Sequence, residues 1–309
     1  IMLGSTADSL FWMFRYIERA ENTLCLIESG FQLHLISSKN LKNEWDAILK
    51  TSSIRQFFTK NNSQLDSLKI INFMFKDQIN SNNIYELISK ARENARRSRV
   101  AMTLEVWESV NTCWLFLKEQ LKKNVTENRV QSLIKDTREK IALIYGYLNK
   151  TMLKDEILNF CYLGTYIERF NNTARILNTR QYLLIEERLY GLEYYNNFQL
   201  EMILRSISSY RSFMWKNQNT INSKKVSNFL ISDKDMPRSL MFSIQETIQC
   251  IKLILNKNIY KNACYKTAQN IQRKIQSRKM FSNNYLFLND LIDLNMKLAT
   301  EIEEEFNFH

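Results

Sequence analysis

The stretch YIERAENT at residues 16–23 returns as YIERFNNT at residues 166–173. Each copy lies in an apolar-rich stretch of helical composition, so each predicts a helix that carries a Glu-Arg pair. A repeat with a spacing of 150 residues indicates a duplicated domain-sized unit and not a solenoid. We therefore expect two similar halves, residues 1–150 and 151–309, packed as one compact unit about a pseudo-twofold axis.

The likeness between the halves continues outside this motif. Ile48-Leu49-Lys50 returns as Ile203-Leu204-Arg205, and the segment 73–77 returns as 229–233. The spacing between the copies drifts from 150 to 156 residues along the chain, as short insertions in connecting loops produce. Both halves are thus expected to follow one structural plan.

The composition favours an all-α fold. Five Gly and one Pro in 309 residues leave too few turn-forming residues for a many-stranded sheet. Pro237 is expected in the first turn of its helix, where its missing N–H has no partner to lose. Hydrophobic periodicity predicts helices over residues 5–35, 43–58, 64–76, 84–100, 103–123, 127–149, 152–188, 195–216, 223–231, 237–256, 258–279 and 283–306.

Several classes of protein and site are excluded or disfavoured. No apolar run approaches the roughly 18 residues of a membrane span, and the start lacks the basic-then-apolar order of a secretory signal, so we expect a soluble cytoplasmic protein. Five cysteines without a Cys-x-x-Cys pair predict buried free thiols. With only His34 and His309, a di-iron site built from Glu-x-x-His pairs is excluded, and His34 is expected to be an ordinary helix residue. The glycines supply no phosphate-binding loop, and neither a metal nor a cofactor is expected.

The net charge of +11 and the pI near 9.3 raise the question of an anionic partner. Two groups of residues predict a basic helix face: Arg92, Arg96 and Arg99, which recur at helical spacing, and a second cluster of Arg273, Lys274, Arg278 and Lys279. Such a face is most often solvated, but a site for a phosphorylated or carboxylate ligand stays open. No nucleic-acid reader motif is present, so nucleic acid is not the expected partner, although it is not excluded.

The Glu-Arg helices carry the candidate site. Glu18 and Asn22 share one row of the helix at i, i+4, as do Arg15 and Arg19 in another. In the first interpretation the Glu and Arg side chains cross-link helices inside the bundle. In the second they surround a polar pocket, where carboxylates bind a cationic or amide group and guanidiniums bind a carboxylate or phosphate. The second copy contributes the equivalent candidates Glu168, Arg169 and Asn172.

The two copies are not chemically equivalent. Thr165 stands where the first copy has Arg15, and Asn171 stands where it has Glu21. We therefore expect residues 15–22 to contribute more charge to any pocket than the second copy does. Arg92 and Arg96 are expected to be the additional anion contacts.

Five motifs together resemble the bacterial alpha-E family, over essentially the whole chain. They are the paired Glu-Arg helices, residues 91–96 (ARENAR), residues 105–108 (EVWE), residues 151–155 (TMLKD) and residues 235–239 (DMPRS). The resemblance implies an α-helical domain with an ER motif, typically duplicated. The family has no established catalytic residues to carry across.

The resemblance also implies a functional setting. The resemblance implies that this protein, like other members of the family, accompanies circularly permuted ATP-grasp ligases, transglutaminase-like proteases and an NTN-hydrolase-type peptidase. The expected role is therefore in an ATP-dependent peptide synthesis or amide-modification system, beside an ATP-grasp partner and with a transglutaminase-like protease as a possible further member. Two alternatives stay open. The chain is an autonomous enzyme acting on an amide or phosphoryl substrate through its Glu and Arg residues, or it is a basic scaffold for RNA.

Overall fold

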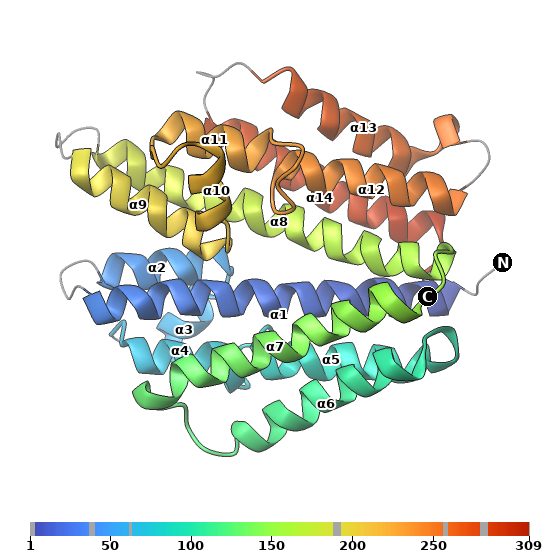
Figure 1. The fold of residues 1–309 in the computed structure, drawn as a ribbon, viewed down its shortest axis with the longest axis horizontal. Coiled ribbons are helices and arrows are strands. Elements are labelled where there is room, and N and C mark those ends of the chain that lie inside the picture. The colour runs from blue at the N-terminus through green and yellow to red at the C-terminus, as the bar shows by residue number, and fades with distance from the viewer. Residues whose placement is uncertain are drawn as a thin grey trace. The chain divides into compact units, whose positions relative to one another are not determined.

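The computed structural model describes residues 4–36, 41–61, 64–187, 193–255, 259–278 and 284–308. Every regular element in these ranges is helical, with fourteen α-helices, two short 3-10 turns and no strand, which confirms the all-α prediction. The chain divides into two compact units, Ile1–Gly164 and Thr165–His309, and the division falls within helix α8 (Figure 1). The sequence repeat places the boundary earlier, between residues 150 and 151.

Unit 1 is built around the long helix α1. Along α1, Leu10, Phe14 and Ile17 recur every third or fourth residue and are fully buried, as expected for the apolar stripe of a packed helix. Helix α1 packs against α5 and α7, and α6 closes the ring by packing against the same two helices. The helices of unit 1 are α1 (Gly4–Ile36), α2 (Leu41–Thr51), α3 (Arg55–Asn61), α4 (Ser67–Lys76), α5 (Ile84–Arg97), α6 (Leu104–Gln120) and α7 (Glu127–Thr151), with the 3-10 turn Arg99–Ala101 before α6.

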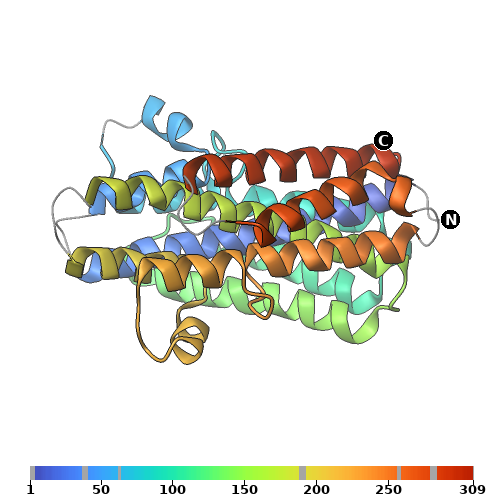
Figure 2. The same cartoon turned by 90° about the horizontal axis from the view of Figure 1, so that it is seen from above.

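Unit 2 has the same order of elements in its described residues. Helix α13 packs against α12 and α14, and α8 contacts α14 through a hydrogen bond of 2.8 Å between the Asn178 and Asn289 side chains. Its helices are α8 (Glu156–Glu187), of which the part up to Gly164 belongs to unit 1, α9 (Glu193–Ser206), α10 (Tyr210–Lys216), α11 (Ser223–Ile231), α12 (Leu240–Leu255), α13 (Ala263–Gln276) and α14 (Asn284–Glu305), with the 3-10 turn Ile259–Lys261 before α13. In Figure 2, α3 (light blue) and α10 (gold) each stand off the long helices of their own unit.

Two helices that the sequence pattern predicts as continuous are broken. The pattern predicts one helix over 43–58 and another over 195–216, but each is divided in two. The break lies at Ser53 (φ 57°) in the first unit and at Ser208 (φ 53°) in the second. A residue in the left-handed region ends an α-helix, and serine gives no strong sequence signal for this conformation, so the prediction was wrong there.

Helices α5 and α12 begin with a side-chain cap at equivalent positions. The Oδ1 atom of Asn83 accepts from the Glu86 N–H at 2.8 Å, and the Oγ atom of Ser239 accepts from the Phe242 N–H at 3.0 Å. Because α12 begins at Leu240, Pro237 lies in the turn before it, and the prediction that Pro237 occupies the first helical turn was wrong. The other predicted helices agree with the structure to within a few residues.

The five cysteines are free and buried, as predicted. None of the helices in the described ranges has both the length and the apolar character needed to cross a membrane. The side chain of His34 and the whole of His309 lie outside the described residues, so the expectation for His34 stays a prediction.

Candidate functional site

The glutamate of the first Glu-Arg pair is completely buried. Glu18 lies on α1 with no exposed surface, and its Oε2 atom accepts a hydrogen bond of 2.9 Å from the Tyr145 hydroxyl of α7. The ring of Tyr145 packs against Phe14 with their centroids 5.8 Å apart. Since a buried carboxylate needs hydrogen-bond donors, this contact ties α7 to α1.

The arginine of the same pair points to a different part of the unit. The Arg19 Nη1 atom donates to Asn82 Oδ1 at 3.3 Å, in the loop that precedes α5. This loop is itself ordered by side chains, since the Asn82 N–H donates to Asn80 Oδ1 at 3.1 Å and Asn83 Nδ2 donates to the Asp77 carbonyl oxygen at 3.0 Å. Adjacent positions on α1 therefore hold α7 on one side and the loop before α5 on the other.

The second Glu-Arg pair repeats this arrangement within unit 2. Glu168 is buried, and the Arg169 Nη1 atom donates to the Pro237 carbonyl oxygen at 3.4 Å, in the loop that precedes α12. Thr173 supports the same loop by donating to the Arg238 carbonyl oxygen at 2.9 Å. On the side of α14, Asn295 Nδ2 donates to a carbonyl oxygen of α8, that of Ile167, at 3.1 Å.

The remaining predicted site residues lie in separate places. The Arg15 guanidinium stacks over the Trp12 ring at 4.2 Å, whereas Asn22 is buried within the unit. Arg92 turns toward α6, where its Nε atom donates to Asn111 at 2.7 Å. Arg96 is exposed and forms an ion pair of 2.8 Å with Glu93. These contacts of Arg92 and Arg96 do not join them to the candidates on α1. Asn172 is partly buried on α8.

Sequence reasoning missed a cation that joins α7 to α1. Arg138 contacts Glu21 at 3.2 Å and Glu28 at 2.8 Å. Burial alone would lower the pKa of Arg138, but Cys25 and the two carboxylates raise it above its ordinary value. The two acids lie seven residues apart on α1, which is a spacing that places them on one face of the helix. The sequence does not show that α7, which carries Arg138, is the neighbour of that face.

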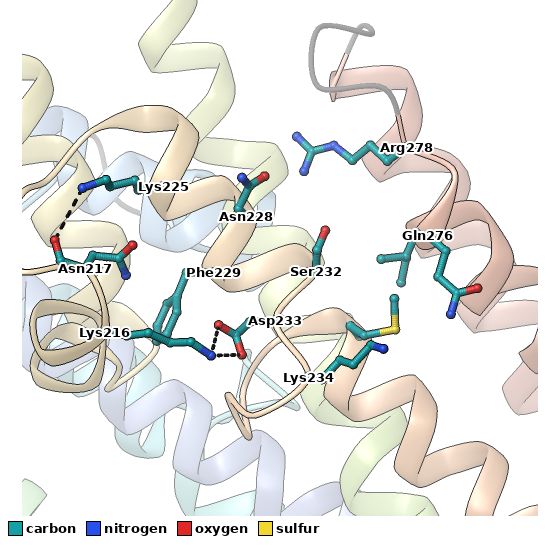
Figure 3. Close-up of a pocket in the computed structure, with 12 residues that line it drawn as sticks. Lys216, Asn217, Lys225, Asn228, Phe229, Ser232, Asp233, Lys234, Gln276 and Arg278 are labelled. Atoms are coloured by element: carbon teal, nitrogen blue, oxygen red, sulfur yellow. Dashed lines mark hydrogen bonds and ion pairs between the residues drawn. The ribbon is translucent and has the colours of Figure 1, made fainter.

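The described part of unit 2 also contains an open, basic pocket, and Arg278 of the second basic cluster is the lining residue that the sequence pattern marked. It has a volume of about 520 Å³ and lies between α10, α11, the loop after α11 and the end of α13 (Figure 3). Four cationic side chains and one carboxylate line it, together with Asn217, Asn228 and apolar side chains. The charged lining residues are Lys216, Lys225, Lys234, Arg278 and Asp233.

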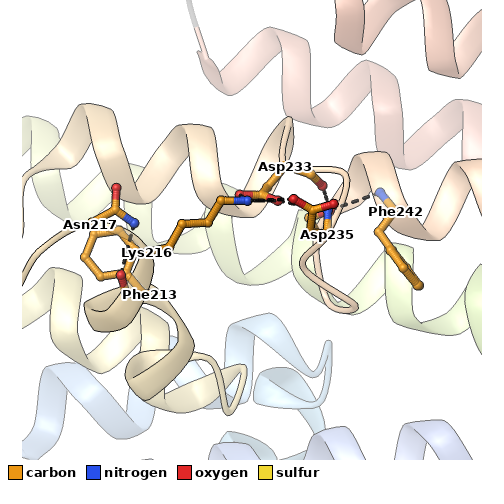
Figure 4. A network of polar contacts seen from close by, with 7 residues as sticks. Phe213, Lys216, Asn217, Asp233, Asp235 and Phe242 are labelled. Atoms are coloured by element: carbon orange, nitrogen blue, oxygen red, sulfur yellow. Dashed lines mark hydrogen bonds and ion pairs between the residues drawn. The ribbon is translucent and has the colours of Figure 1, made fainter.

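The charges of this pocket are held in different ways. The Lys216 Nζ atom lies 2.7 Å from Asp233 and 3.0 Å from Asp235, and these hydrogen bonds raise the pKa of Lys216 (Figure 4). The Arg278 Nη2 atom donates to Ser227 at 2.9 Å, and burial lowers the pKa of Arg278. The exposed Lys234 ammonium forms no ion pair with any described residue. The pocket therefore carries a net positive charge and suits an anionic ligand.

The described ranges hold no cluster of metal-binding side chains, and three of the buried thiols have raised pKa values. No three His, Cys, Asp or Glu side chains there lie close enough together to hold a metal ion. Burial raises the pKa values of Cys113, Cys250 and Cys264 to about 12, so these thiols stay protonated near neutral pH.

Comparison with known proteins identifies the family. No curated protein matched the chain, and no solved structure matched it. The sequence model of one family, described as a predicted alpha-helical domain with a conserved ER motif, matches residues 2–306. Because this match covers essentially the whole chain, the chain belongs to this family, Alpha-E.

Proposed function

We propose that this chain is the helical binding component of an ATP-dependent peptide synthesis or amide-ligation system. In this role it acts beside a circularly permuted ATP-grasp ligase and holds a peptide for it, and a transglutaminase-like protease belongs to the same system. The observation that carries the proposal is the basic pocket of unit 2, where four cationic side chains face one carboxylate. Such a pocket attracts carboxylates, which are the groups that ATP-dependent ligases activate.

We further propose that the two units arose by tandem duplication and pack about a pseudo-twofold axis. The matching order of seven helices within the described part of each unit supports this proposal. So do the equivalent helix breaks at Ser53 and Ser208 and the equivalent caps at Asn83 and Ser239.

The Glu-Arg pairs fit this proposal as organising elements of each unit. Glu18 and Glu168 are buried, and Arg19 and Arg169 each reach the loop before the fifth helix of their own unit. We propose that the pairs shape the units and that Arg15, Asn22 and Asn172 support them there. Arg92 and Arg96 remain candidates for contacting a partner surface.

Co-purification tests the proposed function. A tagged chain is co-expressed with the circularly permuted ATP-grasp protein encoded in the same genome, and the affinity-purified material is analysed by size-exclusion chromatography. A stable complex is expected, and an untagged chain serves as the control for nonspecific capture. Separate elution of the two proteins at micromolar concentration would remove support for the partnership. Amide or phosphoryl chemistry by the isolated chain would instead favour the autonomous enzyme, and RNA binding with steep salt dependence would favour the scaffold.

A further inference from the structure

Unit 1 shows how the fourth helix of a unit can bind main chain. On α4, Asn72 Nδ2 donates to the Val125 carbonyl oxygen at 2.9 Å, and the Val125 N–H donates back to Asn72 Oδ1 at 2.9 Å. One side-chain amide thus satisfies both backbone polar groups of one residue. Nearby, the Lys76 ammonium donates to the carbonyl oxygens of Leu121 and Lys123, both at 3.1 Å. The segment after α6 is held on α4 through its backbone, and the apolar side chains of Leu121 and Val125 in the same segment are buried.

Helix α11 resembles α4 around this amide, with four identical residues among nine aligned positions. The sequence from 69 to 77 is KIINFMFKD, and that from 225 to 233 is KVSNFLISD, which places Asn228 at the position of Asn72. The helix caps agree, since Asp66 accepts from the third residue after it and Asn222 does the same. The ring that follows the amide also packs alike: Phe58 and Phe73 lie 5.2 Å apart at 72°, and Phe213 and Phe229 lie 5.3 Å apart at 78°.

In unit 2 this amide lies in the lining of the basic pocket. Asn228 donates and accepts no side-chain hydrogen bond with any described residue, and Figure 3 shows it between Lys225 and Arg278. Ser232 replaces Lys76, so the long side chain that holds backbone in unit 1 has no counterpart here. The pocket volume of about 520 Å³ falls within the roughly 300–1,000 Å³ of sites that enclose small ligands.

The surrounding charges define which peptide fits. Lys216 is engaged by Asp233 and Asp235, whereas Lys234 has no ion pair among the described residues. Lys225 contacts only neutral oxygens in this part of the chain, including the Asn217 carbonyl oxygen at 3.5 Å. Acids therefore engage Lys216, whereas Lys225 and Lys234 form no ion pair with a described residue and leave positive charge near the amide of Asn228.

We propose that this pocket binds a short, extended, acidic peptide, with Asn228 paired to the N–H and C=O groups of one peptide residue and with Lys225, Lys234 and Arg278 binding its carboxylates. The amide supplies the preference for peptide over other anions, because a phosphate group offers no paired N–H and C=O. The cations supply the preference for acidic side chains. The proposal names the substrate class of the proposed function and rests on it for its biological meaning.

Binding of a tetraglutamate peptide, acetylated and amidated at its ends and labelled with a fluorophore, tests this site by anisotropy at constant salt. Asn228→Leu keeps the side-chain size and removes both hydrogen bonds, so about a tenfold loss of affinity is expected. Lys234→Ala should weaken binding severalfold, whereas Lys224→Ala, an exposed change on the same helix outside the pocket lining, should not. A tetra-alanine peptide of the same design should bind far more weakly than tetraglutamate.

Three outcomes would overturn the proposal. The first is the absence of tetraglutamate binding at millimolar concentration, as expected if the chain itself occupies the pocket. The second is equal affinity in the Asn228→Leu and Lys224→Ala proteins. The third is displacement of the peptide by equimolar inorganic phosphate. Formation of the complex with the ATP-grasp protein is measured separately. If the peptide binds but no complex forms, the proposed function is wrong and the site stands. If the complex forms but the peptide does not bind, the site is wrong and the proposed function stands.

Discussion

The close approach of α8 to α1 within unit 1 makes Gly164 a sharp test of the fold. A Cβ atom built at Gly164 would overlap the Phe11 carbonyl oxygen and lie 3.0 Å from its carbonyl carbon and 3.3 Å from the Arg15 backbone nitrogen. Carbon atoms pack best at about 3.5–4.0 Å, so the two helix backbones would have to move apart by roughly 0.5–1 Å. Backbone atoms cannot rotate away as a flexible side chain can.

Gly164→Ala should therefore lower the free energy of unfolding of unit 1. Overpacking costs about 1–3 kcal/mol, and more where backbone must shift, so about 3 kcal/mol is a reasonable steric cost. Alanine also gains about 1 kcal/mol of helix propensity over glycine, which leaves a net loss of about 2 kcal/mol. The matched control is Gly146→Ala in α7, where an added Cβ meets no atom within 4 Å. That change should stabilise by up to about 1 kcal/mol.

Urea unfolding followed by tryptophan fluorescence measures this difference. Four of the five tryptophans, at positions 12, 45, 107 and 114, belong to unit 1, so the signal reports mainly on that unit. Both substitutions share the propensity gain, and the difference between them isolates the steric cost at about 3 kcal/mol. If Gly164→Ala unfolds at the same urea concentration as Gly146→Ala, the inferred contact between α8 and α1 is wrong.

Three further predictions follow from unit 1 and from the thiols. Tyr145→Phe removes the hydroxyl that donates to buried Glu18 and should cost about 1.5–3 kcal/mol in urea unfolding, and an unchanged midpoint would contradict this role. Arg138→Met keeps the aliphatic stem of the side chain but removes its contact to Glu28. A double-mutant cycle with Glu28→Gln should give a coupling energy of about 0.2–1 kcal/mol, because both side chains are about one-third exposed. A coupling energy of zero would refute this ion pair. Burial raises the pKa of the Cys113 thiol from 9.0 to about 12. The protonated thiol therefore contributes its full stabilisation below about pH 9, and this contribution is lost as the pH rises toward 12. In Cys113→Ala, the free energy of unfolding should fall less steeply over this alkaline range.

The sequence predicted the helices well because their signals are local. The apolar stripe of α1 and the scarcity of Gly and Pro are visible in any window of the chain. The breaks at Ser53 and Ser208 were missed because a serine in the left-handed region has no distinctive signal. Pro237 was misplaced because the chain makes a capped turn before α12, and Ser239 is the residue that caps it.

The candidate site was predicted less completely because contacts depend on which helices are neighbours. The repeated motif drew attention to Glu18 and Arg19, but their partners Tyr145 and Asn82 are 127 and 63 residues away in the sequence. The pocket had two readable signals, the basic cluster that contains Arg278 and the Asn-Phe pair that recurs in KIINFMFKD and KVSNFLISD. The meaning of the Asn-Phe pair depends on a difference between the units, since Asn72 is paired to main chain and Asn228 is not paired in the described part of the chain.

The Glu-Arg motif and the basic pocket are connected through one loop of unit 2. Arg169 and Thr173 of α8 hold this loop by the carbonyl oxygens of Pro237 and Arg238. The start of the same loop carries Asp233, whose Oδ1 atom accepts from the Asp235 N–H at 2.9 Å and whose carboxylate binds Lys216. The repeated Glu-Arg motif thus lies outside the pocket lining, but Arg169 and Thr173 of its helix contact the segment that carries Asp233. A structural role for the Glu-Arg pair and a binding role for the protein are therefore compatible, because the first supports the second.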